Sequence, residues 1–179
     1  ALGDDLAAIC TPDKTIDLAG KLVAPGLIDV HVHYRQPGFI QKETIKTGSL
    51  AAAHGGFTTV CAMANLDPVP DTADRIKKMR ALNQKDGVVH ILQYAAITQG
   101  CQGKKINDYA ALKQAGAFAF SDDGSGIQSA AVMYQAMKQA AAVGMPIVEH
   151  IEDESLLLGG VMNAGKRAEA LNLPGMLDL

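Results

Sequence analysis

Apolar and polar residues alternate in blocks along this chain, and each apolar block is followed by a block with helical spacing. Five apolar runs predict strands over residues 27–33, 57–63, 88–97, 117–121 and 146–150. The stretches between them predict helices over residues 43–54, 72–85, 108–114 and 129–143, each followed within two residues by glycine. A last helical stretch is predicted between Asp153 and Leu171. The chain therefore reads as a series of βα units of about thirty residues.

Strands that alternate with helices form parallel sheets, and two folds of this kind fit the pattern: a doubly wound sheet and a (β/α)8 barrel. The glycine-rich motif of dinucleotide-binding folds does not follow the first strand, which gives that fold little support. A closed barrel needs eight strands and about 250 residues, whereas 179 residues with five predicted strands are available here. We therefore expect either an open sheet or an α/β barrel of the TIM type of which about the first five βα units are present.

The N-terminal residues follow a different pattern. Leu6 to Cys10 and Thr15 to Leu18 predict two short strands separated by a Pro-Asp turn. We interpret residues 1–24 as part of a small β-subdomain and residues 25–179 as the N-terminal part of the barrel. Because the chain begins with Ala1 and not with Met, we expect a fragment or a processed chain.

Two histidines lie at the carboxyl end of the first predicted strand, in the run Asp29-Val30-His31-Val32-His33. Alternate side chains of a strand share a face, so His31 and His33 should point the same way, about 7 Å apart along the strand. Two imidazoles in this arrangement can bind one metal ion. The alternative is a pair of half-buried structural histidines, but two of them at a strand end favour the metal site.

Later strand ends carry further candidates. Asp122 and Asp123 follow the fourth predicted strand, and His150 ends the fifth. Either aspartate could instead cap a helix, and His150 could be a hydrogen-bonded core residue. In a parallel barrel, however, the carboxyl ends of all strands meet at one mouth. His31, His33, an aspartate and His150 would then form a mixed nitrogen and oxygen ligand set that suits Zn²⁺ or a similar divalent ion.

The remaining histidines and the cysteines carry no predicted site. His54 lies at a helix end and His90 lies early in the third strand, so both are interpreted as structural. Cys10, Cys61 and Cys101 are odd in number and scattered, which indicates free thiols in a reducing compartment, the cytoplasm.

Composition narrows the class of partner. The formal net charge of −3 argues against nucleic acid as the main partner. With 48% apolar and 20% charged residues, the chain is typical of a globular protein, and its longest apolar runs are too short for a transmembrane helix. We expect neither nucleic-acid nor membrane binding, and a small molecule as the partner.

Taken together, the motifs resemble the metal-binding signature of dihydroorotases in the amidohydrolase superfamily. The resemblance covers nearly the whole chain and rests on residues 26–33 (GLIDVHVH), Arg35 with Pro37-Gly38, residues 42–44 (KET), residues 51–59 (AAAHGGFTT) and residues 120–124 (FSDDG). It implies a (β/α)8 barrel beside a small β-subdomain. His31 and His33 match the first pair of zinc ligands, Asp123 matches best the bridging ligand, and His150 matches a ligand of a second metal. The implied cofactor is one or two Zn²⁺ ions.

The resemblance also implies a substrate site. Arg35 and Asn65 match residues that bind the substrate's carboxylate in the family. Asn65 lies in the run Met63-Ala64-Asn65-Leu66, where the family has Met-Pro-Asn-Thr, so the flanking proline and threonine are replaced here.

The implied activity is the reversible ring closure of N-carbamoyl-L-aspartate to dihydroorotate, a step of pyrimidine synthesis. No catalytic residue is assigned within this chain, because the family takes another metal-binding histidine and its general acid/base aspartate from later strands, which we expect beyond Leu179. A homodimer or an association with aspartate transcarbamoylase would be in keeping with the resemblance.

Two alternatives remain at this stage. Hydantoinases and allantoinases of the same superfamily bridge their metals with a carboxylated lysine after the fourth strand, where this chain has Ser121-Asp122-Asp123. A non-catalytic dihydroorotase-like subunit would act only as a scaffold, but such subunits typically lose metal ligands, and the candidates that this length allows are all retained.

Overall fold

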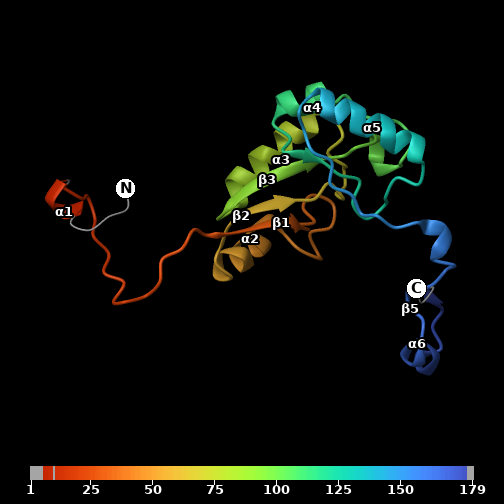
Figure 1. Ribbon diagram of the computed structural model, residues 1–179, viewed down its shortest axis with the longest axis horizontal. Helices are drawn as coiled ribbons and strands as arrows, with labels where there is room; N and C mark the ends of the chain where they lie inside the picture. The colour runs from red at the N-terminus through yellow and green to blue at the C-terminus, as the bar shows by residue number, and fades with distance from the viewer. Residues whose placement is uncertain (1–5, 10, 177–179) are drawn as a thin grey trace.

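A curled parallel sheet forms the centre of the molecule (Figure 1). The computed structural model describes residues 6–9 and 11–176. Its main sheet has the order β1-β2-β3-β4 with every neighbouring pair parallel. The strands are β1 (Leu27–Val32), β2 (Phe57–Ala62), β3 (His90–Ala95) and β4 (Ala119–Phe120). Strands that are neighbours both in sequence and in space are typical of a barrel and not of a doubly wound sheet, in which the strand order reverses.

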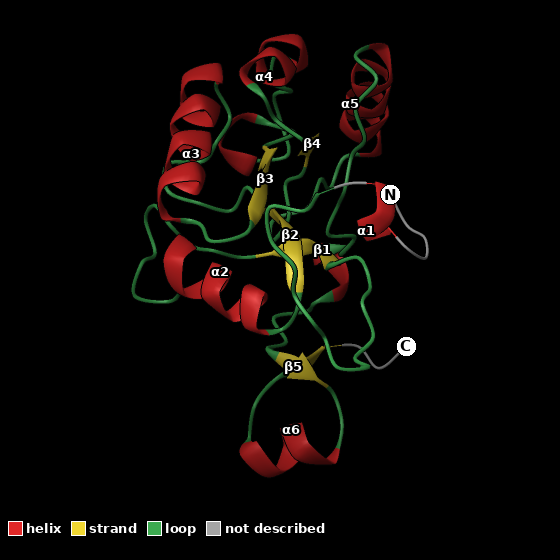
Figure 2. Cartoon of the chain, turned by 90° about the vertical axis from the view of Figure 1, so that its left-hand side faces the viewer, coloured by secondary structure: helices red, strands yellow, loops and turns green. Residues whose placement is uncertain are grey.

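Helices follow the strands and surround the sheet from outside, as Figure 2 shows. They are α2 (Ile45–His54), α3 (Ala73–Asp86), α4 (Tyr109–Ala115) and α5 (Ala130–Ala142), with a short 3₁₀ helix η1 (Gln99–Cys101) after β3. This is the part of a (β/α)8 barrel that the sequence predicts. The four predicted strands and four predicted helices of this region are confirmed, with ends that differ by up to a few residues.

Capping residues explain where these helices begin. The side chains of Thr44, Thr72, Asp108 and Ser129 accept hydrogen bonds from backbone N–H groups in the first turns of α2, α3, α4 and α5. These contacts satisfy donors that a helix cannot satisfy internally. Gly116 ends α4 with a φ of 97°, a left-handed conformation that glycine adopts without steric cost.

The fifth predicted strand is present only as a short pairing. Ile147 forms an isolated parallel bridge with Phe120 of β4. The backbone N–H of Phe120 donates to Pro146, and that of Val148 donates to Phe120. The segment therefore continues the sheet beside β4, but Glu149 and His150 lie beyond its hydrogen-bonded part.

Two predictions at the N-terminal end of the chain are wrong, and one at the C-terminal end holds in part. Leu6–Ile9 form a short helix, α1, where a strand was expected, and Thr15 to Leu18 contain no strand. Cys10 lies outside the described residues. A strand needs a neighbouring strand to satisfy its backbone, and within the described chain these N-terminal residues have none. Of the helical stretch predicted between Asp153 and Leu171, the structure holds two short helices, η2 (Glu154–Leu156) and α6 (Lys166–Leu171). Between them lies β5 (Met162–Asn163), which pairs with β6 (Gly175–Met176).

Two apolar clusters fill the space between the sheet and the helices. One joins β3 and β4 to α3, α4 and α5 through residues such as Ile97, Leu112 and Phe120. The other joins β1 and β2 to α2 and α3 through Val60 and Met79. None of the helices in the described part of the chain has the length and hydropathy that a membrane span requires.

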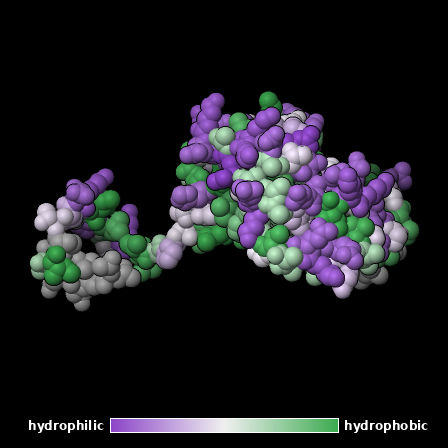
Figure 3. Space-filling view, turned by 90° about the horizontal axis from the view of Figure 1, so that it is seen from above, coloured by the Kyte–Doolittle hydropathy of each residue, from purple (hydrophilic) through white to green (hydrophobic). Residues whose placement is uncertain are grey.

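Several apolar side chains of the sheet stay exposed. On β1, Leu27 is 55%, Ile28 64% and Val30 58% exposed. Figure 3 shows apolar patches (green) between polar ones (purple) on the main body, with the N-terminal segment to one side. Exposed apolar surface of this extent is normally covered by another segment. Among the described residues, no segment covers these side chains of β1.

Candidate metal centre

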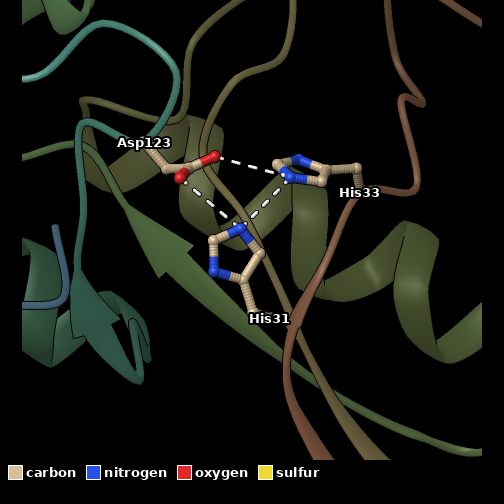
Figure 4. Close-up of side chains that lie close together, drawn as sticks. All are labelled: His31, His33 and Asp123. Carbon is tan, nitrogen blue, oxygen red and sulfur yellow. Dashed lines mark hydrogen bonds and ion pairs between the residues drawn. The ribbon is translucent and has the colours of Figure 1, made fainter. Parts of the chain in front are cut away.

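Three side chains converge at the carboxyl ends of β1 and β4 (Figure 4). The Nε2 atoms of His31 and His33 lie 3.2 Å apart. Asp123 presents one carboxylate oxygen to each ring, with Oδ1 3.4 Å from His31 and Oδ2 3.5 Å from His33. The Asp123 side chain is 5% exposed, and the two imidazoles are 44% and 30% exposed. The cluster is therefore anchored at a buried carboxylate and open on the histidine side.

Local irregularity in β1 helps to aim the two rings. Asp29 pairs with Val60 and Val32 pairs with Ala62, so β1 holds one extra residue between these pairs. Such a bulge redirects the side chains of the strand that carries it. The hydroxyl of Tyr94 on β3 donates to the carbonyl of Val30 at 2.9 Å and holds this part of the strand. The prediction that His31 and His33 point the same way is confirmed.

The two neighbouring aspartates have separate roles. Asp122 is fully buried and turns away from the cluster. Its carboxylate accepts hydrogen bonds from the N–H groups of Ile97 (2.8 Å) and Thr98 (3.1 Å) and from the Thr98 hydroxyl. Burial raises the pKa of Asp122, and these hydrogen bonds act in the opposite direction. Asp122 thus ties the end of β4 to the loop after β3, and Asp123 is the aspartate that faces the histidines.

The spacing and the chemistry of the cluster fit a metal ion. Ligand atoms bound to zinc at about 2.0–2.1 Å in tetrahedral geometry lie about 3.3 Å from one another. The two Nε2 atoms lie 3.2 Å apart, and the carboxylate presents a different oxygen to each ring, at 3.4 and 3.5 Å. Two imidazole nitrogens and a carboxylate oxygen are also a donor set that divalent zinc accepts. His31, His33 and Asp123 therefore form a group that could bind a metal.

His150 lies beside this group but is less tightly arranged. Its Nδ1 is 3.7 Å from Asp123 Oδ1, and its Nε2 is 3.4 Å from Glu152 Oε2. The side chains of His150 and Glu152 are both nearly half exposed. A groove of about 520 Å³ opens next to them, lined in part by Met133, Met137 and Ile147. The structure thus brings three of the four predicted ligands together, with the fourth at the edge.

The two predicted substrate residues differ in their contacts with the cluster. Asn65, after β2, contacts it directly: its Oδ1 is 3.0 Å from His33 Nδ1, and its Nδ2 is 3.4 Å from Asp123 Oδ2. Arg35, after β1, has a left-handed φ of 51°, and its side chain makes no ion pair within the described residues. A left-handed arginine costs conformational energy, and such residues cluster at functional sites.

The predictions for His54 and His90 agree with their positions. His54 is the last residue of α2, and His90 begins β3 at the end of the sheet opposite the cluster.

Glu149 is an unusual residue that the sequence analysis did not identify. Both of its carboxylate oxygens are buried without a hydrogen-bond partner in the described chain. Burial, and then the negative charge of Asp122, raise the pKa of Glu149 to about 7. Because side chains alternate along a strand, Glu149 should point to the face opposite that of its neighbour His150. Its position next to His150 is the sequence signal that could have identified it.

Two known proteins with similar sequences carry the name dihydroorotase. Residues 20–175 match the family model described as dihydro-orotase-like. The chain is 62% identical to a dihydroorotase of Ligilactobacillus salivarius over 180 aligned positions, which is 100% of this chain and 42% of that protein. It is 58% identical to a dihydroorotase of Enterococcus faecalis over 93% of this chain and 39% of that protein. The chain thus spans about two fifths of the length of these relatives.

Solved structures agree on the fold. An L-hydantoinase from Arthrobacter aurescens superposes with a TM-score of 0.70 at 24% identity, over 83% of this chain and 34% of that one. A dihydroorotase from Saccharomyces cerevisiae, solved with 5-fluoroorotic acid, superposes with a TM-score of 0.55 at 19% identity, over 79% of this chain and 39% of that one. The family model, matched across the sheet and the histidine–aspartate cluster alike, shows that this chain belongs to the dihydro-orotase-like family.

Proposed function

We propose that this chain forms the metal-binding part of a dihydroorotase, which interconverts N-carbamoyl-L-aspartate and dihydroorotate in pyrimidine synthesis. The observation that carries the proposal is the cluster of His31, His33 and Asp123, whose spacing suits a divalent ion. The identity of 62% with a dihydroorotase over the whole chain supports the choice of reaction.

The proposed metal is zinc, as one or two ions. Bound there, zinc would lower the pKa of a water molecule and polarise an amide carbonyl, which is the chemistry that opening a cyclic amide requires. His31 and His33 would bind through Nε2, and Asp123 would bind through the carboxylate that faces both rings. His150 is proposed as a further ligand, because its Nδ1 is within 3.7 Å of the same carboxylate.

Arg35 and Asn65 are proposed to bind the substrate's carboxylate. A guanidinium can donate two parallel hydrogen bonds to a carboxylate, and the Asn65 amide can add a third donor. Asn65 already lies against the cluster, so a carboxylate on its Nδ2 would place the reacting ring beside the metal ligands. The backbone strain at Arg35 is in keeping with a residue held for binding.

The general acid/base is proposed to lie in the part of the relatives that this chain does not cover. The chain spans 42% of the Ligilactobacillus salivarius enzyme. The exposed apolar residues of β1 and the open groove beside His150 give such a segment surface to cover. A cytoplasmic location, a homodimer and an association with aspartate transcarbamoylase stay predictions from the sequence.

The alternative activities have less support. A hydantoinase shares the fold at 24% identity, whereas the dihydroorotases match at 58–62%. The end of β4 carries Ser121-Asp122-Asp123 instead of the lysine that the family resemblance assigns to hydantoinases. A scaffold without activity would not need a metal-ligand group such as His31, His33 and Asp123, whose ligand atoms lie within 4.8 Å of one another.

One experiment tests the proposed function directly. A chimera is made in which this chain replaces the matching segment of the Ligilactobacillus salivarius dihydroorotase. With zinc bound, it should hydrolyse dihydroorotate, followed by ultraviolet absorbance, and leave hydantoin unchanged. A chelator should abolish the activity, and added zinc should restore it. Hydrolysis of hydantoin in preference to dihydroorotate, or no turnover of either, would contradict the proposal.

A further inference from the structure

Asn65 contacts two of the three clustered side chains at once. Its Oδ1 is 3.0 Å from His33 Nδ1, and its Nδ2 is 3.4 Å from Asp123 Oδ2. The residue comes from the loop after β2, between the two strands that carry the cluster in the sheet order. Neither contact is needed for binding a substrate, so the position of Asn65 calls for a second explanation.

The chemistry of the two contacts fixes the direction of both hydrogen bonds. An amide oxygen only accepts, so the short contact requires a proton on His33 Nδ1. The opposite rotamer of the amide would set its oxygen against the Asp123 carboxylate, which also only accepts. Asp123 therefore selects the orientation of Asn65, and Asn65 selects the tautomer of His33. With the proton on Nδ1, the lone pair of His33 Nε2 is free and points at His31 and Asp123.

Packing leaves the amide little room to move. Gly124, which follows Asp123, has a φ of 87°, and a Cβ built there would lie 3.2 Å from Asn65 Nδ2. A side chain at this position would be strained and would press on the amide. Leu66 and Ala64 on either side of Asn65 are buried, which holds the loop against the sheet.

We propose that Asn65 is a positioning residue that holds His33 in the metal-binding tautomer and aligns it with Asp123. This inference deepens the proposed function and rests on the metal centre assigned there. Second partners of ligand histidines orient the ring and strengthen binding, and their loss typically costs about 10–100-fold in metal affinity. The long contact from Nδ2 to Asp123 leaves that group available to a substrate carboxylate, so one amide links substrate binding to the metal ligands.

Zinc affinity and the state of His33 test the proposal in the 179-residue chain. Asn65→Ala should weaken zinc binding by about 10–100-fold. In the zinc-loaded chain, nuclear magnetic resonance should show a His33 Nδ1 proton protected from water, and this signal should be lost in Asn65→Ala. Asn65→Asp keeps an acceptor for that proton and replaces the Nδ2 donor that faces Asp123 by an oxygen, so it should keep the signal that the alanine variant loses.

Asn83→Ala is the matched control. Asn83 is buried, whereas Asn65 is half-buried; Asn83 donates to a side chain on a strand, Gln93, and makes no hydrogen bond to the clustered residues. It should lower thermal stability and leave zinc affinity and the His33 signal unchanged. Equal loss of zinc affinity in Asn83→Ala and Asn65→Ala would reduce Asn65 to a structural residue and overturn the proposal.

Two further results separate this inference from the proposed function. Asn65→Ala that raises only KM in the chimera, with zinc affinity and the Nδ1 proton retained, would leave Asn65 as a substrate residue and overturn its positioning role. A chimera that binds zinc in an Asn65-dependent way but does not act on dihydroorotate would support the positioning role and contradict the proposed activity. No zinc binding by the unsubstituted chain would overturn both.

Discussion

The two sides of the candidate centre differ in how firmly their side chains are held. At the ends of the paired strands β1 to β4, His33 is hydrogen-bonded to Asn65, β1 receives a hydrogen bond from Tyr94, and the Asp122 carboxylate fixes the end of β4. On the side of residues 146–150, one bridge at Ile147 pairs the segment to β4, and His150 is nearly half exposed. Side chains of a site are therefore only as well placed as the strand ends that carry them.

Adding the remaining segment of the relatives should have the largest effect on the rate of hydrolysis. That segment would pack beside His150 and supply the general acid/base. Residues 1–179 alone should hydrolyse dihydroorotate slower than the chimera by about 10²–10⁴-fold, the usual cost of lacking a general acid/base. Turnover of both zinc-loaded proteins is followed by ultraviolet absorbance. Similar rates would mean that the catalytic machinery lies wholly within this chain.

Ligand removal should affect the two sides unequally. Loss of a residue that only orients a metal ligand costs about 10–100-fold in metal affinity. Asp123→Ala should weaken zinc binding by more than this, because it removes a ligand atom that also contacts both histidine rings. His150→Ala should have a smaller effect in the 179-residue chain, where His150 stands 3.7 Å from that carboxylate. Zinc titration of both variants measures the difference. A larger loss for His150→Ala would reverse the comparison.

Arg35→Lys tests the substrate contact on the β1 side. An ammonium cannot reproduce the paired donors of a guanidinium, so kcat/KM in the chimera should fall by about tenfold or more. Bound zinc, measured by metal analysis, should stay the same, because Arg35 touches no clustered side chain among its described contacts. Unchanged kinetics would remove Arg35 from the substrate site.

Asp122→Ala should mainly destabilise the fold. It leaves the N–H groups of Ile97 and Thr98 without their acceptor, and each buried unsatisfied group costs about 1–3 kcal/mol. Chemical unfolding measures the loss. Thr98→Val serves as a companion: it removes the hydroxyl that donates to Asp122 and accepts from the Gly103 N–H, and keeps the Asp122 carboxylate. Zinc affinity lost in Asp122→Ala with no change in stability would mean that Asp122, and not Asp123, is the ligand.

The smallest effect concerns the pH dependence on the His150 side. Glu149 has a pKa of about 7 in the folded chain against 4.5 for an ordinary glutamate. Between these values the folded state binds the extra proton, so this contribution to the free energy of unfolding is complete below about pH 4.5 and is lost as the pH rises through about 7. Chemical unfolding without zinc measures the free energy of unfolding at pH 5 and at pH 8. Glu149→Gln should make the decrease in this free energy between the two pH values smaller. Glu152→Gln, at an exposed position, should not, and equal slopes for all three proteins would contradict the assignment.

Short-range signals account for the elements that were predicted well. Thr44, Thr72, Asp108 and Ser129 are capping residues visible in the sequence, and each begins a helix of the structure. The stretch from Asp153 to Leu171 also begins at a capping residue, Asp153, but the structure divides it into short pieces. Strand pairing depends on a partner far along the chain, which explains why the N-terminal strands were predicted wrongly.

The sequence by itself determined the βα alternation and the pair of histidines at one strand end, because spacing along a strand decides which side chains share a face. It also indicated Asp123 through a family resemblance, although local pattern left Asp122 equally open. Only the tertiary structure decided which aspartate faces the histidines. The Asp122 carboxylate accepts hydrogen bonds from the N–H groups of Ile97 and Thr98, which lie 25 and 24 residues away in the sequence. The contact between Asn65 and His33 spans 32 residues and has no local signal. Such contacts arise from the curl of the sheet, which brings separate strand ends to one place.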